Sequence, residues 1–521
     1  MKTEDPEITA GGDANSPPSP DPPGNVVDPT RWPLWRKWSI VVCIALMYML
    51  ANFGTIIIVP GVPRILSDFH VSRDHLYEPL IVSIWELGEG VGSFLVGPLS
   101  EQYGRSVVYH GGNVLFILCS VAAALSVNIG MLVAFRFING LAITTITLAP
   151  SITGDLFVRE ERGAAMALAI TLPLIGPCAA PIVGGYVTSD LGWRWAIWII
   201  AIAVGSVSLC SLIVMKETYR FKIAQDQPAS PGGSPPREPK LQTLLRPMRL
   251  LFSSPVVLVT SLYTALTYGI SYLILTTLSE IMHDIYNFSQ GPVGLTFLGR
   301  AIGNLIGLAI YGLTSDRYLQ HRRQKTGRSL PEDRLPLMLL GTILLPTGLF
   351  LYGWSSHSHI HWIVPLIGTG IVGASLILTR LPTENYLVDA FDPDGTSASV
   401  LAANATLSAL FGALFPLAGP SLYRTLGVGW GNSLLAFISL AFLPLFTVLW
   451  IHGEILRREG WGYLWVIVEP WFQGTHQRGS GGLEGERYHA EDENSGDGTQ
   501  QGRREGEKHA VRTHQQGVRD V

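Results

Sequence analysis

The sequence predicts an all-α polytopic membrane protein with twelve transmembrane helices in two six-helix, pseudo-symmetric halves. Of its 521 residues, 47% are hydrophobic and only 15% are charged, whereas soluble domains average roughly 25% charged residues. The apolar residues gather into stretches of about 20, the length that a helix needs to cross a bilayer. Six such stretches precede a polar linker and six follow it. This pattern argues against a soluble enzyme, and the net charge of −4 gives no basic footprint for nucleic acid.

The predicted spans divide the chain into five regions. Two polar tails, 1–37 and 453–521, are expected to be disordered and cytoplasmic, and a linker, 216–254, separates a first half, 38–215, from a second half, 255–452. The first tail lacks the charged start and apolar core of a signal peptide. The spans are predicted at 38–60, 79–99, 108–128, 131–153, 163–189 and 195–215, and at 255–279, 292–313, 335–354, 360–379, 397–420 and 431–452.

Basic residues in the loops predict the orientation of the spans. With the N-terminus in the cytoplasm, 22 lysines and arginines lie on the cytoplasmic side, among them Arg380 after the tenth span. Four lie on the opposite side: Arg64, Arg73, Arg194 and Arg424. Because cytoplasmic loops carry an excess of Lys and Arg, both termini are predicted to be cytoplasmic. The expected location is the plasma membrane.

An internal repeat supports two related halves. Residues 97–101 (GPLSE) end the second span, and residues 312–316 (GLTSD) end the eighth in the same pattern, G-x-x-S-acid. Parallel halves related by an axis along the membrane normal form one recurring transporter plan, with the substrate near the midplane between them. The repeat therefore favours a transporter.

Short motifs follow one another in a fixed order from about residue 31 to 460. They are 97–105 (GPLSEQYGR), Arg136 with Gly140, 154–157 (GDLF) with Arg162 and Gly163, Gly176 and Pro177 with Pro181, Gly184 and Gly185, 192–195 (GWRW), 217–219 (ETY), 331–336 (PEDRLP), 385–389 (NYLVD) and 415–417 (FPL). This set resembles the major facilitator superfamily and, within it, the fungal twelve-span drug:proton antiporters. The resemblance implies the major facilitator fold and a monomer. Ser408 departs from it, because similar fungal sequences often carry arginine there.

Four fixed charges lie inside the predicted spans: Glu86, Glu89, Arg136 and Arg300. A charge at the midplane costs about 2.5 to 3.5 kcal/mol on insertion scales, so such residues generally face a cavity or a partner. Glu86 and Glu89 are spaced i, i+3 on one helical face, and we expect them to share and exchange a proton. Two alternatives stay open, namely an ion pair of one glutamate with Arg136 and contact of the glutamates with substrate.

The two arginines have separate expected roles. The resemblance implies proton coupling for Arg136, and a static partner for a helix end is the alternative. Arg300 lies twelve residues before Gly312, much as Glu86 lies eleven before Gly97, so the two occupy similar depths in their halves. Arg300 is expected either to bind an anionic substrate or to pair within the structure.

Two groups of residues are predicted to gate the halves. Glu101, Arg105, Asp316 and Arg317 lie at cytoplasmic helix ends, where charges can bond across a loop; a solvated loop is the alternative. Gly176 and Pro177 open the fifth-helix motif, which the resemblance links to export and to restricting proton leak. Simple helix packing is the alternative for that motif.

Polar and aromatic faces on two helices suggest a substrate cavity. Tyr268 and Tyr272 share a face with Thr264 on the seventh helix, and Asn404 and Ser408 share one on the eleventh. A wide cavity with aromatic walls and few polar anchors suits amphipathic organic molecules. Contacts between helices are the alternative for these stripes.

These observations predict a secondary active exporter of a small amphipathic organic compound, such as a drug, toxin or secondary metabolite, by proton antiport with alternating access. The alternative on the same fold is a facilitator or proton-coupled importer of a nutrient such as a sugar or organic acid. The two-copy architecture argues against a receptor or an intramembrane enzyme. The sequence shows no metal-ligand cluster and no G-x-x-x-x-G-K-[ST] phosphate loop, so neither a cofactor nor ATP is expected.

Overall fold

The computed structural model describes residues 29–71, 76–157, 165–166, 168–169, 172–218, 240–327, 330–391 and 396–459. The chain divides into two units, Met1–Leu464 and Trp465–Val521, and all described residues belong to the first. Their regular structure is helical, with no strand in the described ranges. Residues 1–28, 219–239 and 460–521, which hold most of the predicted tails and linker, lie outside the described residues.

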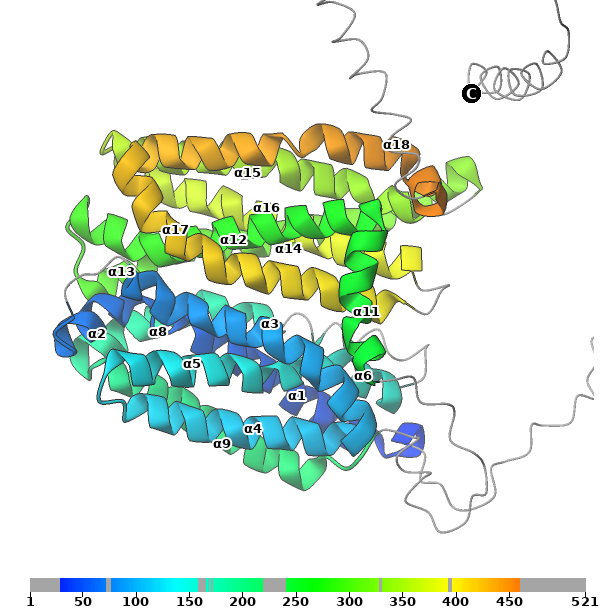
Figure 1. The fold of residues 1–521 in the computed structure, drawn as a ribbon, viewed down its shortest axis with the longest axis horizontal. Helices are drawn as coiled ribbons and strands as arrows, with labels where there is room; N and C mark the ends of the chain where they lie inside the picture. Colours follow the sequence, from blue (N-terminus) through cyan, green and yellow to red (C-terminus); the bar gives the residue numbers. More distant parts are fainter. Residues whose placement is uncertain are drawn as a thin grey trace, which may run out of the picture. The chain divides into compact units, whose positions relative to one another are not determined.

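The described part of the first half consists of helices (Figure 1). Its described helices are α1 (Leu34–Ile56), α2 (Val62–Asp68), α3 (Tyr77–Tyr103), α4 (Arg105–Ala124), α5 (Ile129–Ile143), α6 (Ala149–Leu156), α8 (Gly176–Asp190) and α9 (Trp193–Val214). A 3-10 turn, Thr144–Leu148, joins α5 to α6. The chain can reverse within one residue between α3 and α4 because Gly104 adopts φ +97°, a conformation that only glycine reaches without strain.

The second half repeats this arrangement after a helix that crosses one end of the spans. Its helices are α11 (Lys240–Ser253), α12 (Pro255–Asp284), α13 (Gln290–Thr296), α14 (Leu298–Thr326), α15 (Leu335–His357), α16 (Ile363–Phe391), α17 (Ser397–Leu440) and α18 (Leu443–Glu459). A 3-10 turn, Pro331–Arg334, precedes α15. We name the two ends of the spans the α13 end and the α11 end, after the short helices that lie there (Figure 1).

The described helices agree with twelve spans once two features are taken into account. Ten described stretches are long and apolar enough to cross a membrane. One of them, Ser399–Arg458, corresponds to the last two predicted spans. The helical conformation is broken between these spans at Gly427, which has φ +74°. The fifth predicted span, 163–189, lies partly outside the described residues. Its continuous described part begins with a 3-10 turn, Leu172–Ile175, and continues as α8, which has 15 residues.

Several helices extend beyond the predicted spans, and the extension of α16 matters for the site. The tenth span was expected to end at Thr379, before Arg380, but α16 continues to Phe391. The helix accommodates the charge because Arg380 pairs with Glu384 one turn later on the same helix, with 2.7 Å between Nε and Oε1. Without Arg380, 21 basic residues remain on the predicted cytoplasmic side, so the expected asymmetry persists.

Close packing of glycines holds matching helix pairs together in both halves. A Cβ at Gly88 or Gly140 would strike the backbone of the facing helix between α3 and α5, and a Cβ at Gly303 would strike Gly370 between α14 and α16. Small residues let membrane helices approach this closely. The second and fourth spans of each half therefore pack by the same device.

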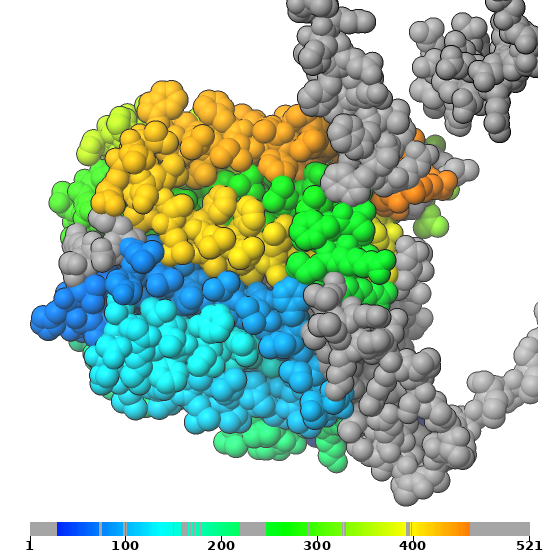
Figure 2. All heavy atoms as spheres, in the orientation of Figure 1, coloured from blue at the N-terminus to red at the C-terminus, as the bar shows by residue number. Residues whose placement is uncertain are grey.

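The two halves meet reciprocally. The second span of the first half, α3, packs against the fifth of the second half, α17, and α8, the fifth of the first half, packs against α13 and α14. Gly90 allows the first contact, since a Cβ there would lie 3.2 Å from Cβ of Ala409. Figure 2 shows α17, in yellow, beside the blue side chains of α3. This exchange of second and fifth spans is what a pseudo-two-fold axis between the halves requires.

Candidate functional site

A cavity of about 90 Å³ lies where the two halves meet. Residues from α1, α3 and the 3-10 turn of the first half line it together with residues from α12, α16 and α17 of the second half. They are Tyr48, Glu86, Glu89, Ser93, Thr147, Tyr268, Arg380, Glu384, Asn404, Ala405, Ser408 and Ala409. The cavity therefore combines the predicted glutamates with most of the predicted substrate-contacting residues.

Glu86 is the most enclosed charged group of this cavity. Its side chain is only 2% exposed, and the Tyr268 hydroxyl donates a hydrogen bond of 3.1 Å to its Oε2. The rings of Tyr268 and Tyr272 lie 4.9 Å apart between centroids, so Tyr272 braces Tyr268 from one turn away. Gly412 makes room for this group, because a Cβ there would lie 3.0 Å from the Tyr268 ring.

Glu89 lines the same cavity one turn along α3, as its spacing from Glu86 predicts. Ser93 donates its hydroxyl to the Glu89 backbone carbonyl at 2.9 Å, which leaves the Glu89 carboxyl to the cavity. Two carboxyl groups in one enclosed space repel each other when both are ionised. The pair can thus bind and release a proton, with the Tyr268 hydroxyl as a fixed partner.

Arg380 and Glu384 belong to this cavity, although the sequence analysis placed Arg380 in a loop and did not consider Glu384. Besides its ion pair with Glu384, Arg380 places its guanidinium carbon 6.0 Å from the centre of the Tyr268 ring. Their i, i+4 spacing, directly after the apolar stretch that ends at Thr379, is the signal that could have revealed them.

Asn404 and Ser408 contribute polar atoms without protein partners. They are 3% and 8% exposed, and within the described residues neither Oδ1 of Asn404 nor Oγ of Ser408 has a hydrogen-bond partner. Buried polar groups in proteins are nearly always hydrogen-bonded. These two atoms can therefore form hydrogen bonds with a molecule in the cavity.

Arg136 lies outside the cavity and ties three helices together. Its Nε donates to the Ile81 carbonyl at 2.6 Å and one terminal nitrogen donates to the Thr55 carbonyl at 3.0 Å. Its guanidinium carbon lies 5.1 Å from the centre of the Trp85 ring. Among the described residues, no ion pair within 4.0 Å joins Arg136 to Glu86 or Glu89. Trp85 precedes Glu86 on α3, so Arg136 fixes the helix that carries the glutamates.

Arg300 occupies a separate hollow closer to the α13 end. It donates to the Ser271 carbonyl at 3.1 Å, and it shares a small hollow with Ile56, Pro177 and Asn304. Gly176 adjoins this region, since a Cβ there would strike the Met49 carbonyl of α1. The predicted gating residues Gly176 and Pro177 thus lie where α8 packs against α1.

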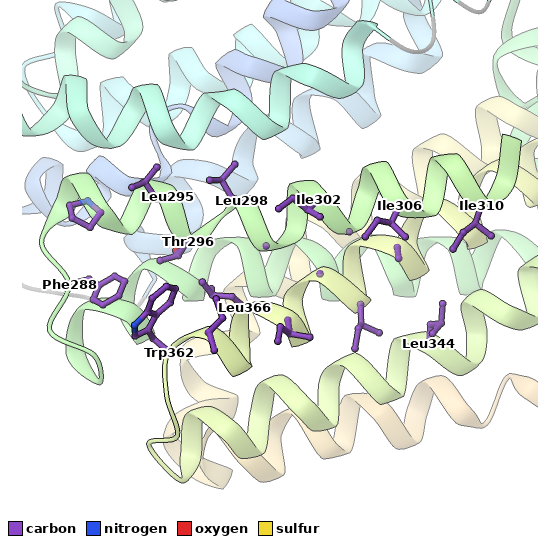
Figure 3. A pocket seen from close by; sticks show the side chains of 18 residues that line it. Phe288, Leu295, Thr296, Leu298, Ile302, Ile306, Ile310, Leu344, Trp362 and Leu366 are labelled. Carbon is purple, nitrogen blue, oxygen red and sulfur yellow. The ribbon is translucent and has the colours of Figure 1, made fainter. Parts of the chain in front are cut away.

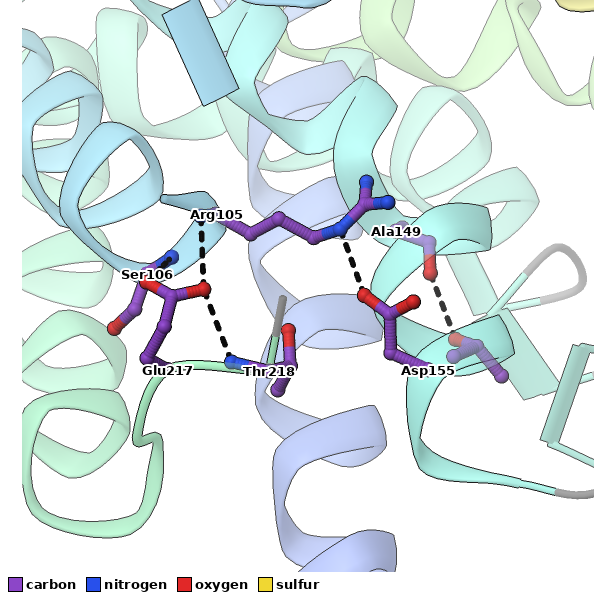
Figure 4. Close-up of polar contacts among 7 residues, drawn as sticks. Arg105, Ser106, Ala149, Asp155, Glu217 and Thr218 are labelled. Atoms are coloured by element: carbon purple, nitrogen blue, oxygen red, sulfur yellow. Dashed lines mark hydrogen bonds and ion pairs between the residues drawn. The ribbon is translucent and has the colours of Figure 1, made fainter. Parts of the chain in front are cut away.

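Charged residues at the α11 end of the first half join three segments (Figure 4). Arg105, at the start of α4, pairs with Asp155 of α6 at 2.7 Å. The Glu217 carboxylate accepts the backbone N–H groups of Arg105 at 3.0 Å, Ser106 at 3.2 Å and Thr218 at 3.0 Å. Glu217 therefore caps α4 from 112 residues away. The side chain of Glu101, the other charged gating residue predicted in the first half, lies outside the described residues.

A corresponding group lies at the α11 end of the second half. Arg334, at the start of α15, pairs with Asp389 of α16 at 2.5 Å, as Arg105 pairs with Asp155. Glu332 pairs with Arg457 of α18 at 2.7 Å. Asp316 and Arg317, the residues predicted from the repeat, are exposed on α14. The ion pairs at this end are made instead by Glu332 and Arg334, which belong to the motif 331–336.

A larger hollow of about 770 Å³ does not have the chemistry of a transport site. It lies on the outward faces of α14 and α16, and its lining is apolar (Figure 3). Ile302 and Ile367 are each 53% exposed there. In a protein that crosses a bilayer, such a surface faces hydrocarbon.

Comparisons with known proteins show the family and the fold. A family model for the Major Facilitator Superfamily matches residues 44–416. The MFS-type transporter penM of Penicillium rubens is 42% identical over 84% of this chain and 88% of that protein, and Efflux pump radE of Floropilus chiversii is 38% identical over 84% of each. The crystal structure of a D-xylose-proton symporter is 17% identical and superposes with a TM-score of 0.60 over 78% of this chain and 97% of the other, which concerns the fold alone. The chain belongs to the Major Facilitator Superfamily and is an integral membrane protein that transports small molecules.

Proposed function

We propose that this transporter exports a small amphipathic organic compound, such as a drug, toxin or secondary metabolite, in exchange for protons. The observation that carries the proposal is the cavity between the halves, where Glu86 and Glu89 face Asn404 and Ser408. Carboxyl groups supply a proton-binding site, and unpartnered polar atoms supply anchors for a solute. The name of one relative, Efflux pump radE, also supports export.

The cavity suggests how proton and solute exclude each other. When Glu86 and Glu89 are protonated, the space between the halves carries less charge and the halves can close around it, because a charge in a water-poor site is costly. When the proton leaves, the carboxylates favour water or a polar solute group. Access from one side of the membrane at a time then couples the two movements.

The gating proposal rests on the charged groups at the α11 end. Arg105 with Asp155 and Arg334 with Asp389 fasten helix ends within each half, so each half can move as a unit. Gly176 and Pro177 keep α8 close to α1, beside the contact of α8 with α13 between the halves. The proposed proton-coupling role of Arg136 is to hold α3, and with it Glu86, in place.

The proposed orientation places the α11 end in the cytoplasm. Arg105, Arg246, Arg334 and Arg457 all lie on helices at that end, whereas Arg64 and Arg194 lie at the α13 end (Figure 1). The excess of positive charge on cytoplasmic loops supports this assignment. We propose that the protein acts as a monomer in the plasma membrane with both termini in the cytoplasm.

Substitution of the two glutamates tests the proposal. Purified protein is reconstituted into vesicles with an imposed pH difference, and uptake of a panel of fluorescent cationic, neutral and anionic amphipathic dyes is measured. Glu86→Gln and Glu89→Gln are each expected to reduce gradient-driven accumulation at least about tenfold, because an amide cannot carry the proton. Exchange without a gradient should persist.

The matched control is Glu454→Gln, an exposed glutamate on α18 that pairs with Arg458 away from the cavity. It should transport like the unmodified protein. Accumulation that is independent of the pH difference in the unmodified protein would contradict antiport. Accumulation driven by movement of protons and dye in the same direction would replace export with import.

A further inference from the structure

We propose that Arg380 is the internal counter-ion of the proton site: Glu384 holds it in the present state, and it turns to Glu86 and Glu89 when they lose their proton. This inference deepens the proposed function and rests on it. It assigns a role to two residues of α16 that neither the motifs nor the repeat singled out. Arg380 acts here by positioning charge, since the proton itself resides on the glutamates.

The first argument is the placement of Arg380. Its guanidinium lies over Tyr268 at 6.0 Å, and the hydroxyl of the same tyrosine touches Oε2 of Glu86 at 3.1 Å. A single aromatic ring thus lies between the guanidinium and the most buried carboxyl. Arg380, Glu86 and Glu89 line one cavity, so the guanidinium shares a single space with both carboxyl groups.

The second argument is the difference in burial between the two ends of the cavity. Glu86 is 2% exposed, whereas the side chains of Arg380 and Glu384 are 41% and 33% exposed. The pair with Glu384 is therefore less enclosed by packing than the Glu86 carboxyl. A buried carboxylate at Glu86 has more to gain from the guanidinium than Glu384 has to lose.

The third argument is charge balance. The ionisable groups around Arg380 are Tyr48 on α1, Glu86 and Glu89 on α3, Tyr268 on α12 and Glu384 on its own helix. The residues of α17 in the cavity, Asn404 and Ser408, carry no charge. Arginine stays protonated in proteins, so it is the one fixed positive charge among these described residues. Without it, a proton-free cavity would hold three carboxylates with no cation.

The experiment measures proton binding directly and needs no substrate. The infrared carbonyl band of protonated carboxyl groups is titrated against pH in the full-length protein in lipid vesicles, and Glu86→Gln and Glu89→Gln identify which part of the band belongs to the cavity. Arg380→Gln should move the midpoint of that band to higher pH, and Glu384→Gln should move it to lower pH. The expected size is about one pH unit, the effect of a nearby charge on a carboxyl group.

The double variant Arg380→Gln/Glu384→Gln separates a moving counter-ion from a static neutral pair. If Arg380 turns to the glutamates, its loss dominates, and the midpoint should stay at least about half a pH unit above that of the unmodified protein. If the two charges only cancel each other, the midpoint returns to the unmodified value and the inference is overturned. Shifts of both single variants in the same direction would overturn it as well.

Two controls keep the outcomes distinct. Glu454→Gln and Arg458→Gln remove an ion pair of the same i, i+4 spacing from α18 and should leave the midpoint unchanged. Gradient-driven dye accumulation is then measured in the same vesicles. If the unmodified protein shows the band but no proton-coupled transport, the proposed function fails. The titration midpoints of the variants still test whether Arg380 is the counter-ion. If transport is coupled but the double variant behaves like the unmodified protein, only the role of Arg380 fails.

Discussion

At the α11 end of each half, charged residues connect the third span to the fourth and sixth spans, but the two halves use different interactions. In both halves an arginine at the start of the third span pairs with an aspartate at the end of the fourth: Arg105 with Asp155 and Arg334 with Asp389. The end of the sixth span is also tied to the start of the third in both halves. The first half makes that tie with Glu217 and backbone N–H groups, and the second makes it with an ion pair between side chains.

This difference determines whether the sign of the charge at each position can be reversed. Glu217 accepts N–H groups at the N-terminus of α4, where the helix dipole favours a negative charge, so only an acceptor can serve there. In the second half, the carboxylate is on the turn before α15 and the arginine is on α18, which reverses the sign of the charge that the last span contributes. The backbone donor of that turn is satisfied locally, because Asp333 accepts the N–H of Leu330 at 3.2 Å.

The largest effect is expected from Glu217→Ala. The substitution leaves three backbone donors without their acceptor, and loss of a helix N-cap costs about 0.5 to 2 kcal/mol. It also separates the end of the first half from α4, so gradient-driven transport should fall. The thermal midpoint of the purified protein in detergent measures the loss. Glu332→Ala removes a carboxylate of similar position but leaves the backbone bonds of its turn intact, and an equal or larger loss for Glu332→Ala would contradict the comparison.

The sequence predicted the spans well because their signal, continuous apolar length, depends on local composition. It failed at the end of α16, because hydropathy cannot distinguish a charge in a loop from a charge that is paired inside a cavity. Arg380 and Glu384 were missed for this reason. The shared face of Glu86 and Glu89 was recovered, since spacing on one helix fixes it.

Contacts between helices were harder to predict. Arg136 donates to the backbone carbonyl groups of Thr55 and Ile81. Every residue has such a carbonyl group, so the sequence does not indicate which ones accept. The repeat led to Asp316 and Arg317, because it compares the ends of the second and eighth spans. The contacts of the second half come from Glu332 and Arg334 in the next turn, where the two halves no longer share a sequence pattern.

An intermediate effect is expected from exchanging charges. Glu332→Arg and Arg457→Glu should each reduce folded yield and transport, and the two together should recover most of both, since the pair needs only opposite signs. Coupling energies between contacting residues are about 0.5 to 3 kcal/mol, which a double-mutant cycle on the thermal midpoint can resolve.

A charge exchange between Arg105 and Asp155, the ion pair of the first half, should not recover. In the variant Arg105→Asp/Asp155→Arg, the new carboxylate would lie beside Glu217 at the start of α4, and like charges there repel. Folded yield by size-exclusion chromatography gives the comparison. Recovery in both halves would mean that the backbone bonds of Glu217 do not constrain the charge at residue 105.

The smallest effect is expected from Gly312→Ala, in the second copy of the repeated motif. No atom lies within 4 Å of the position that its Cβ would take, and the residue is exposed within α14, so a methyl group meets no obstacle. Alanine favours a helix over glycine by about 0.5 to 1 kcal/mol, and the thermal midpoint should stay level or rise slightly. Gly303→Ala on the same helix is the matched contrast, because its Cβ would strike the Gly370 carbonyl of α16 and should destabilise the protein. Equal losses of thermal stability from both variants would contradict this expectation. They would indicate that Gly312 packs against a neighbour in another state of the transport cycle, and that the second copy of the motif has a structural role there.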